Sequence, residues 1–461
     1  MKKIFLITAV IYASMLPCKA QKQTPPPGGT AKDFKLSEKN IQKYPNGLKT
    51  TLVHYGSLPK VNISLIIKTG NVHETGQQVW LADLTGRMIR EGTAKLNFSA
   101  LAKKAAMMGG NVNVGVGVAQ TTISGSVLSE YAADFIQLIS EMVMNPAFPA
   151  SELERLKSDL KRQLTVQKAV PQSQAQEKFF EAVYKDQPYG KFFPTEEMIN
   201  SFTVEAVKNF YDKNFGAKRS VLYIVGNFED AAVNKAINNS FTKWKPGPEI
   251  SYPKITTTPV SDTMIIERKG APQTTVMLGL PVITPDNNDY VPLLVTNSLL
   301  GGSFGSRITS NIREDKGYTY SPFSTVSNRK GSSLWYEAAD VTSEHTINSL
   351  LEIEKEIKKL QEIPPDEEEL KGIKNYEAGV FVLQNSTPGG IIGQLNFLDL
   401  YGLNDSYLNN YVKNIHGVTP KKVQEMAKTH IQFDKMAKVL VGDKEKINQQ
   451  IKTQKEKPKA F

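Results

Sequence analysis

The chain has 461 residues, of which 40% are hydrophobic and 22% charged, and its formal net charge is +10 at pH 7. This length exceeds what one ordinary core supports and predicts two or more domains, and the composition is that of a soluble globular protein. The basic residues are spread along the chain without a stripe of interleaved aromatics, so the charge does not point to nucleic-acid binding.

The first twenty residues have the pattern of a secretory signal peptide. Lys2 and Lys3 precede the apolar run 4–16, and small residues at Cys18 and Ala20 predict cleavage after Ala20. The apolar run is too short for a permanent membrane span. The proline before Cys18 argues against a lipoprotein signal, and lipidation at this cysteine is the alternative. Cleavage would leave no cysteine, so we expect an exported, periplasmic protein that depends on packing rather than on disulfides.

A flexible tether is predicted at 21–35, which is rich in Gln, Pro, Gly and Thr. The Tyr-Pro-Asn-Gly segment at 44–47 then predicts a turn. Alternation and β-branched residues predict strands at 50–55, 61–68, 111–118 and 121–127. Helical spacing of apolar residues predicts helices at 78–91, 100–108, 130–144 and 152–167.

A linker with four prolines is predicted at 246–260, and a similar pattern follows it. Strands are predicted at 264–268, 274–280, 321–326 and 333–338. Helices are predicted at 291–300, 304–314, 344–360 and 367–384. The Lys/Gln-rich end of the chain lacks apolar periodicity, and we expect 447–461 to be a flexible tail.

The order of strands followed by helices therefore occurs twice. The segments Phe-Pro-Ala-Ser-Glu-Leu-Glu at 148–154 and Ile-Pro-Pro-Asp-Glu-Glu-Glu at 363–369 correspond in position and in residue type. We predict an α+β fold with two homologous domains, 36–245 and 261–446, each a mainly antiparallel sheet covered by helices on one side.

Residues 79–93 read Val-Trp-Leu-Ala-Asp-Leu-Thr-Gly-Arg-Met-Ile-Arg-Glu-Gly-Thr. The segment resembles the first helix of the pitrilysin/insulinase-type metallopeptidases (the inverzincins), where Gly-Thr follows an H-x-x-E-H motif. The resemblance places the two ligand histidines on Asp83 and Arg87 and the catalytic glutamate on Gly86. A guanidinium is always protonated and glycine supplies no base, so the resemblance implies a zinc site that has been lost. Considered without it, the segment is an amphipathic core helix.

The rest of the chain offers no replacement for the zinc site. The five histidines are all more than five residues apart, and the single cysteine lies in the predicted signal peptide. The family's third ligand is a glutamate on a later helix, and the nearest position here is Lys161, within one or two residues. Asp83 and Arg87, at i and i+4, have the spacing of a salt bridge instead. We predict that this chain holds no metal and no cofactor.

Three shorter segments are similar to the same family, and the resemblance covers about residues 40–445. The Gly-Gly-Asn-Val-Asn segment at 109–113 resembles the start of the active-site edge strand, which takes the substrate as an added β-strand. The Gln-Pro-Tyr-Gly segment at 187–190 and the Val-Gly-Asn-Phe segment at 225–228 resemble a family turn and a strand end. Their order and spacing support the resemblance together.

The closest match lies at 299–308 and 312–321, Leu-Leu-Gly-Gly-Ser-Phe-Gly-Ser-Arg-Ile and Ile-Arg-Glu-Asp-Lys-Gly-Tyr-Thr-Tyr-Ser. In the family this region carries an arginine and, seven residues later, a tyrosine that both reach the substrate beside the zinc. Arg313 and Tyr320 have that spacing. A guanidinium suits substrate carbonyls and a phenol suits an oxyanion. The alternative is an Arg313 that pairs with a neighbouring acid and a Tyr320 that is a core aromatic.

The chain lacks the zinc-binding motif in its first half and keeps the substrate-binding arginine and tyrosine in its second half. In this combination it resembles the two-subunit members of the family. The resemblance implies the non-metal, substrate-binding subunit of a heteromeric periplasmic zinc peptidase, which is inactive alone. Its partner would be a homologous subunit with an intact H-x-x-E-H motif and the zinc, and its substrates would be short or unfolded peptides. The alternative is a scaffold or interaction protein that has the peptidase-like fold and no proteolytic role. A hydrolase with a displaced metal site requires ligands that the sequence does not supply.

Overall fold

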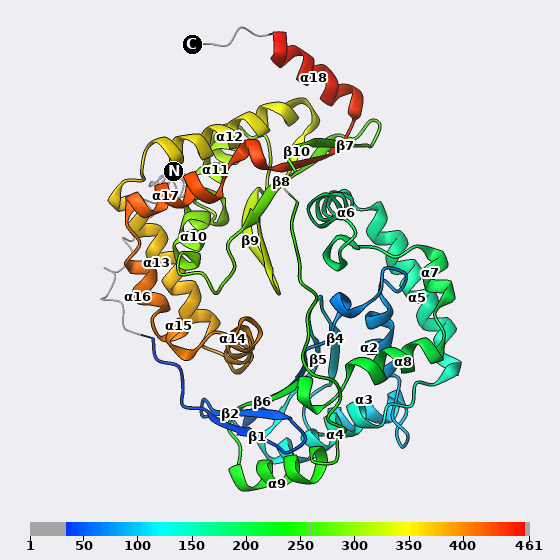
Figure 1. Ribbon diagram of the computed structural model, residues 1–461. Coiled ribbons are helices and arrows are strands. Elements are labelled where there is room, and N and C mark those ends of the chain that lie inside the picture. The colour runs from blue at the N-terminus through cyan, green and yellow to red at the C-terminus, as the bar shows by residue number, and fades with distance from the viewer. Residues whose placement is uncertain (1–33, 259, 457–461) are drawn as a thin grey trace, which may run out of the picture. The chain divides into compact units, whose positions relative to one another are not determined.

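The computed structural model describes residues 34–258 and 260–456 (Figure 1). The predicted signal peptide and most of the predicted tether lie outside these residues, so cleavage and lipidation at Cys18 stay predictions. Strands and helices occur in both halves of the chain, which confirms the α+β class. Within the described residues, no helix combines the length and the apolar composition needed to cross a membrane.

The first half of the chain, residues 34–245, contributes six strands, β1 (Asn40–Lys43), β2 (Lys49–His54), β3 (Lys60–Ile67), β4 (Asn113–Val116), β5 (Thr121–Leu128) and β6 (Ser220–Gly226). They form one sheet in the order β1-β2-β6-β3-β5-β4, in which only β2 and β6 run parallel. β3 illustrates the pattern, because Val61, Ile63 and Leu65 alternate onto one face and are fully buried. The edge strand β4 has a neighbour on one side only.

The second half, residues 261–456, contributes five strands, β7 (Thr263–Glu267), β8 (Gln273–Val282), β9 (Phe323–Arg329), β10 (Ser332–Thr342) and β11 (Ala437–Gly442). Their order is β7-β11-β8-β10-β9, and only β7 and β11 run parallel. Each half thus has a mainly antiparallel sheet with one parallel pair, formed when the last strand of that half returns to the sheet. The strand β9 is an edge here, as β4 is in the first sheet.

The helices fall into two sets. The first half contains η1 (Asn71–His73), α2 (Leu81–Arg90), α3 (Phe98–Met107), η2 (Ser129–Tyr131), α4 (Ala132–Met144), α5 (Ala150–Ala169), α6 (Pro171–Tyr184), η3 (Pro188–Gly190), α7 (Glu196–Ser201), α8 (Val204–Asn214), η4 (Ala217–Arg219) and α9 (Asp230–Phe241). The second half contains α10 (Tyr290–Asn297), η5 (Ser298–Gly302), α11 (Arg307–Thr309), η6 (Ser310–Asp315), η7 (Ser343–His345), α12 (Thr346–Glu362), α13 (Glu367–Gln384), α14 (Pro388–Tyr401), α15 (Asp405–Asn409), α16 (Tyr411–His416), α17 (Pro420–His430), η8 (Phe433–Lys435) and α18 (Lys444–Glu456). The described residues of the predicted linker, 246–260, contain no helix or strand.

One face of each sheet is covered by helices of the same half. In the first half, Ile63 of β3 packs in one apolar cluster with Leu84 of α2 and Phe135 of α4. In the second half, Trp335 of β10 packs in a separate cluster with Ile353 of α12. These are the faces that alternation along the strands predicts to be apolar.

The opposite face of each sheet is covered by a helix from the other half, which the sequence did not predict. Helix α14 lies beside β6 of the first sheet, and α6 lies beside β8 of the second (Figure 1). Ile391 of α14 packs in one apolar cluster with Tyr223 of β6, and Phe179 of α6 in another with Val439 of β11. Both sheets belong to one compact unit that begins at Phe34. The two halves therefore complete each other's cores, and apolar residues on both faces explain why strands such as β6 are buried along their whole length.

The two helices of the glycine-rich segment contain wider π turns, η5 and η6. At Gly301 a Cβ atom would lie 2.5 Å from Ser324 Oγ and 2.7 Å from Glu337 Oε2, so glycine lets η5 lie directly against β9 and β10. The following helix begins at Arg307 rather than at the predicted residue 304. Phe304 is therefore in a loop, where 71% of its surface is exposed.

The flexible tail predicted from residue 447 onward is wrong for the residues up to 456, which form most of α18. Ile447 is fully buried in the core of the second half, and Ile451 packs against the same core. The Asp443 carboxylate accepts hydrogen bonds from the amides of Glu445 and Lys446, both at 3.1 Å, and so caps the helix. Two isoleucines four residues apart were too short an apolar pattern to predict this helix.

Candidate functional site

The helix α2 carries the positions of the degenerate zinc motif. It begins after Trp80, whose φ of 72° is left-handed, and its buried apolar face includes Leu84. The carboxylate of Glu74 accepts hydrogen bonds from the amides of Trp80 (3.1 Å) and Ala82 (2.7 Å), which takes the place of a local N-cap. Burial, together with the negative charge of Asp83, raises the pKa of Glu74 to about 8. The start of α2 is therefore fixed by a carboxyl group that is mostly protonated at pH 7.

Asp83 and Arg87 do not pair with each other, although the sequence allowed a salt bridge. Both lie in the described part of the chain, and no ion pair shorter than 4.0 Å joins them. Asp83 instead accepts a hydrogen bond from Asn71 Nδ2 at 2.6 Å, and Arg87 donates to Gln163 of α5. Burial raises the pKa of Asp83, and the Asn71 hydrogen bond and the Arg87 charge offset part of that rise. Each side chain is held by a neutral amide.

Gly86 occupies the position of the catalytic glutamate, and the structure shows that a larger residue does not fit there. A Cβ atom on Gly86 would lie 2.5 Å from Val116 Cγ2 and 3.5 Å from Val114 Cγ1, both on β4. A separation below 3.0 Å requires the valine or the strand to move. The edge strand thus packs into the space that a glutamate side chain and its water would need.

Gln163 faces the other motif positions, whereas Lys161, which the sequence placed nearest the third-ligand position, points elsewhere. Lys161 Nζ donates to Asn200 Oδ1 at 3.0 Å, while Gln163 bonds Arg87 and lines the same cavity of about 200 Å³ as Asp83. Side chains two residues apart on an α-helix point about 200° apart. An alignment shift of two residues therefore changes which side chain of α5 faces α2.

The residues around α2 do not fit a zinc ion. Tetrahedral zinc needs three or four anionic or imidazole ligands, whereas this site offers the Asp83 carboxyl, the Gln163 amide and the Arg87 guanidinium. Among the residues that the structure describes, no group of three or more His, Cys, Asp or Glu side chains is placed to hold a metal. The Arg87 cation would also repel a divalent cation at this point.

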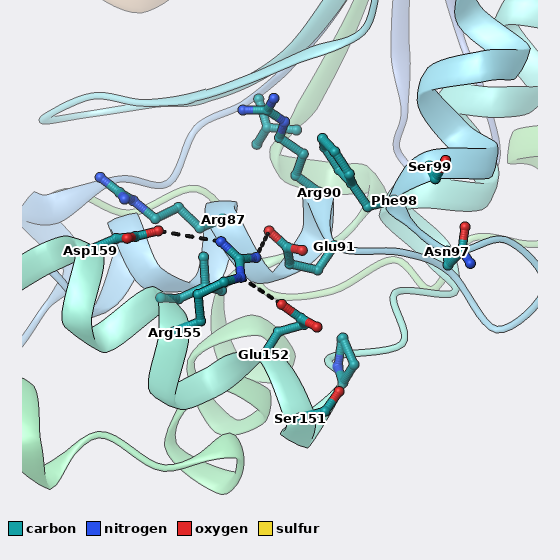
Figure 2. A pocket seen from close by; sticks show the side chains of 13 residues that line it. Arg87, Arg90, Glu91, Asn97, Phe98, Ser99, Ser151, Glu152, Arg155 and Asp159 are labelled. Atoms are coloured by element: carbon teal, nitrogen blue, oxygen red, sulfur yellow. Dashed lines mark hydrogen bonds and ion pairs between the residues drawn. The ribbon is translucent and has the colours of Figure 1, made fainter.

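A larger cavity of about 900 Å³ lies beside these positions, between α2, α3, α5 and β4 (Figure 2). Its acidic residues are already paired, because Arg155 contacts Glu91 at 2.8 Å, Glu152 at 2.7 Å and Asp159 at 3.3 Å. Figure 2 shows the Arg155 guanidinium between these three carboxylates. The cavity therefore has a wall of compensated charges, and its carboxylates are unsuited to act as a general base.

Arg313 and Tyr320, the second set of predicted site residues, do lie together. The Arg313 guanidinium is 4.8 Å from the centre of the Tyr320 ring and 4.4 Å from that of Phe304. Arg313 also pairs with Glu314 at 3.1 Å, as the alternative allowed, but Tyr320 is 78% exposed and is not a core aromatic. Gly317, at φ 66°, turns the chain between the π turn η6 and the tyrosine.

Sequence reasoning missed Phe304 as part of this cluster. The signal was a large aromatic between small residues, in Gly-Gly-Ser-Phe-Gly, a setting that leaves a side chain exposed on a loop. The structure does not bring this cluster into contact with Asp83, Gly86 or Arg87, since the cavities around α2 include none of its three residues. The chain thus holds two separate candidate sites.

Comparison with known proteins identifies relatives of both halves. Residues 50–193 match the family described as Insulinase (Peptidase family M16), and residues 201–376 match the Peptidase M16 inactive domain. An uncharacterized zinc protease of Rickettsia felis is 25% identical over 349 residues, which cover 75% of this chain and 84% of that protein. A protein of Helicobacter pylori named Non-peptidase homolog YmxG is 23% identical over 399 residues, which cover 84% of this chain and 90% of that protein.

Solved structures share the fold as well. The crystal structure of a peptidase M16 inactive domain from Pseudomonas fluorescens superposes with a TM-score of 0.80 at 25% sequence identity. The match covers 88% of this chain and 98% of that one. The two-sheet arrangement with helices exchanged between halves is therefore a shared architecture.

Proposed function

Because this chain belongs to the insulinase (M16) peptidase family, we propose that it is the non-metal, substrate-binding subunit of a heteromeric zinc peptidase. The observation that carries the proposal is the unequal state of the two candidate sites. In α2 the ligand positions are Asp83 and Arg87 and the base position is filled by Val116. Arg313 and Tyr320, by contrast, lie in contact, with the Tyr320 phenol exposed and the Arg313 side chain half-buried.

The role proposed for the pair follows from its chemistry. A zinc ion on the partner subunit would polarise the scissile carbonyl and activate water. Arg313 presents a planar guanidinium that can donate two hydrogen bonds to substrate carbonyl oxygens. The Tyr320 hydroxyl can donate to the oxygen on which negative charge develops. Phe304 and Tyr320 hold the guanidinium between two rings, which limits its motion before substrate arrives.

The partner we propose is a homologous subunit that carries an intact H-x-x-E-H motif and the zinc. The N-terminal signal pattern supports export, and we propose the periplasm as the compartment. The bare edge of β4 supports short or unfolded peptides as substrates, because an extended chain can pair with it through backbone hydrogen bonds. The Helicobacter pylori relative is named a non-peptidase homolog, which supports a non-catalytic role for this chain.

The test is to purify the mature chain alone and together with a homologue encoded beside it that has the intact motif. Peptide cleavage is then measured with and without a chelator. We expect no cleavage by the isolated chain and chelator-sensitive cleavage by the pair at a rate well above that of the partner alone. Chelator-sensitive cleavage by the isolated chain would contradict the proposal. A pair no faster than the partner alone would favour the scaffold function.

A further inference from the structure

A cavity of about 510 Å³ lies where the edge strand of the first sheet meets that of the second. It is bounded by the β4–β5 hairpin, by the end of β9 and the turn after it, and by the end of α14. Its lining residues are Gly115, Val116, Gly117, Val118, Ala119, Gln120, Thr122, Ser327, Asn328, Arg329, Lys330, Leu400 and Tyr401. Two of them are basic and none is acidic, so the cavity has a net positive charge.

Arg329 is the central basic group of this cavity. Its guanidinium lies 4.2 Å from the ring centre of Phe180, 5.2 Å from that of Tyr189 and 5.9 Å from that of Tyr184, all from the first half. The rings contact the flat face of the Arg329 guanidinium. Its N–H groups lie at the edge of that plane and stay available to donate to another partner. Tyr189 is itself fixed, because its hydroxyl donates to the Lys330 carbonyl oxygen at 2.9 Å.

Arg329 has no anion to compensate its charge. Within residues 34–258 and 260–456 no carboxylate lies within 4.0 Å of its guanidinium, which also makes no hydrogen bond to the protein there. Burial lowers the pKa of Arg329, yet a guanidinium stays charged in proteins. A partly buried cation without a partner is unfavourable, and an anion bound in the cavity would compensate its charge.

The acids in the neighbouring cavity do not supply that anion. Arg329 also borders the cavity of about 200 Å³ that contains Glu74 and Asp83. The pKa of Glu74 is raised to about 8, so this group is mostly neutral at pH 7. Asp83 is engaged by Asn71 and lies near the charge of Arg87. Neither acid is within ion-pair distance of Arg329 in the described chain.

Lys330 strengthens the positive potential without closing the cavity. Its ammonium donates to the carbonyl oxygen of Leu400 at 2.6 Å, near the end of α14, and lies 5.9 Å from the ring centre of Tyr401. This hydrogen bond fixes the Lys330 ammonium at the wall of the cavity. Arg329 is therefore the group with free donors, and Lys330 is a fixed charge beside it.

The opposite wall is suited to a peptide backbone. Along 111–118 the residues alternate between valine, on the α2 side, and asparagine or glycine. A Cβ atom on Gly115 would meet nothing within 4 Å, and one on Gly117 would meet only the Gln120 carbonyl oxygen at 3.5 Å. The edge strand therefore presents bare backbone to the cavity, a setting in which another backbone can approach closely.

We infer that this cavity is a carboxylate-binding subsite for an extended peptide, with Arg329 as the residue that grips the carboxylate. The inference rests on the proposed function for the peptide and names the chemistry that the peptide must carry. The bare glycine backbone favours a peptide over a free small anion, and the planar guanidinium suits the two oxygens of a carboxylate. The carboxylate belongs either to the C-terminus of the peptide or to an Asp or Glu side chain.

The experiment measures binding of fluorescein-labelled heptapeptides to the full mature chain by anisotropy. Three peptides share one neutral sequence: one has a free C-terminus, one is amidated, and one is amidated with a central Asp. We expect at least one acidic peptide to bind about tenfold or more tighter than the amidated neutral peptide. Preference for the first alone assigns the terminal carboxylate, and preference for the third assigns a side chain. Equal binding of all three peptides overturns the inference.

Variants then assign the effect to Arg329. Arg329→Met should reduce the preference to within about twofold, and Arg329→Lys should keep only part of it, because lysine cannot form two parallel hydrogen bonds. Arg162→Gln is the matched control, since Arg162 is exposed on α5 and pairs with Asp159, and it should keep the full preference. A preference that survives in a folded Arg329→Met protein overturns the inference.

A second readout does not depend on peptide affinity or on a variant that folds poorly. Acetyl-diglycine and its amide are titrated into the wild-type chain while the Nε–H resonances of arginine are recorded. The free acid should shift a resonance that is absent from Arg329→Lys, and the amide should not. No difference between the two compounds overturns the inference. If the acid binds but the chain with its partner cleaves no peptide, the subsite stands and the proposed function fails.

Discussion

The zinc-motif helix of the first half and the arginine–tyrosine pair of the second half use their polar side chains in opposite ways. Around α2, Asp83 and Arg87 are each bonded to an amide of the protein, and Val116 fills the space beside Gly86. In the second half, Tyr320 is 78% exposed and Arg313 is held mainly by aromatic rings. One site has been absorbed into the packing of its domain, whereas the other still presents donors to solvent.

This difference indicates how a metal site is lost without loss of the fold. Arg87 at a metal-ligand position is a half-buried cation, and Gln163 accepts a hydrogen bond from it. Replacing the base by glycine leaves a space, and β4 fills it. Arg87 and Gly86 therefore both contribute to the stability of the domain, and restoring the motif residues at these positions should lower the free energy of unfolding. The exposed Tyr320 hydroxyl contributes little to packing, so removing it should affect function alone.

The largest expected effect is on cleavage when Arg313 is changed. Arg313→Ala should lower kcat/KM of the subunit pair by about 10²–10³-fold, as expected for removal of a transition-state donor. Tyr320→Phe, which deletes one hydroxyl, should cost about tenfold. Thermal unfolding of Tyr320→Phe should match the wild type, because Tyr320 is exposed. Arg313→Ala also removes the contacts with two rings and Glu314, so its thermal unfolding is measured beside its activity.

The matched controls are Arg162→Ala and Tyr376→Phe, since both parent residues are exposed and lie outside the candidate sites. These proteins should keep full activity. If Arg313→Ala retained wild-type kcat/KM, the Arg313–Tyr320 site would have no role in cleavage. That result would contradict the proposed functional difference between the two sites.

The next effect is on stability when the zinc motif is restored. The triple variant Asp83→His, Gly86→Glu, Arg87→His should be destabilised by about 1–3 kcal/mol or more, because the glutamate would overlap Val116. Urea denaturation measures the loss. The double variant without the glutamate should lose less, and adding Val116→Ala to the triple variant should recover part of it. A triple variant as stable as the double variant would show that β4 moves to accommodate the glutamate at little cost in stability, which would contradict this prediction.

The smallest effect, when measured over one pH unit, is a pH dependence that originates at Glu74. The pKa of Glu74 is about 8 in the folded protein and its ordinary value is 4.5, so the folded protein holds one more proton between these pH values. Stability from this group is present in full below about pH 4.5 and is lost as the pH rises to about 8, by at most about 1.4 kcal/mol per pH unit. Glu74→Gln should remove this slope in urea titrations at several pH values.

Glu74→Ala provides the comparison for that measurement. It removes the same slope and also deletes the acceptor for the amides of Trp80 and Ala82, which should cost about 1 kcal/mol at all pH values. A slope that remains in Glu74→Gln would mean that another buried acid, such as Asp83, is responsible.

The sequence predicted the features that local pattern determines. Alternation gave β3 and β5 nearly to the residue, and Asp366, which caps α13, gave the start of that helix. The spacing of Arg313 and Tyr320 predicted a pair that the structure places in contact. The α+β class and two similar halves also followed from element order.

Features that depend on distant segments were not predictable in this way. Each sheet is covered on one face by a helix of the other half, α14 or α6. The residue pattern of a helix does not show which sheet it packs against, so this arrangement could not be predicted. The π turns around Gly301 depend on the approach of Ser324 and Glu337. Arg329 was missed because one arginine at the end of a strand has no local signal, and its importance comes from the rings of Phe180 and Tyr189.

The zinc content of the purified proteins tests the central claim most directly. The isolated mature chain, the partner and their complex are each measured by atomic emission after removal of loosely bound metal. The division of labour between the two sites predicts no zinc on the isolated chain, and one zinc per complex that is lost when the partner's motif is changed. Zinc bound at one equivalent by the isolated chain, or two equivalents by the complex, would contradict it.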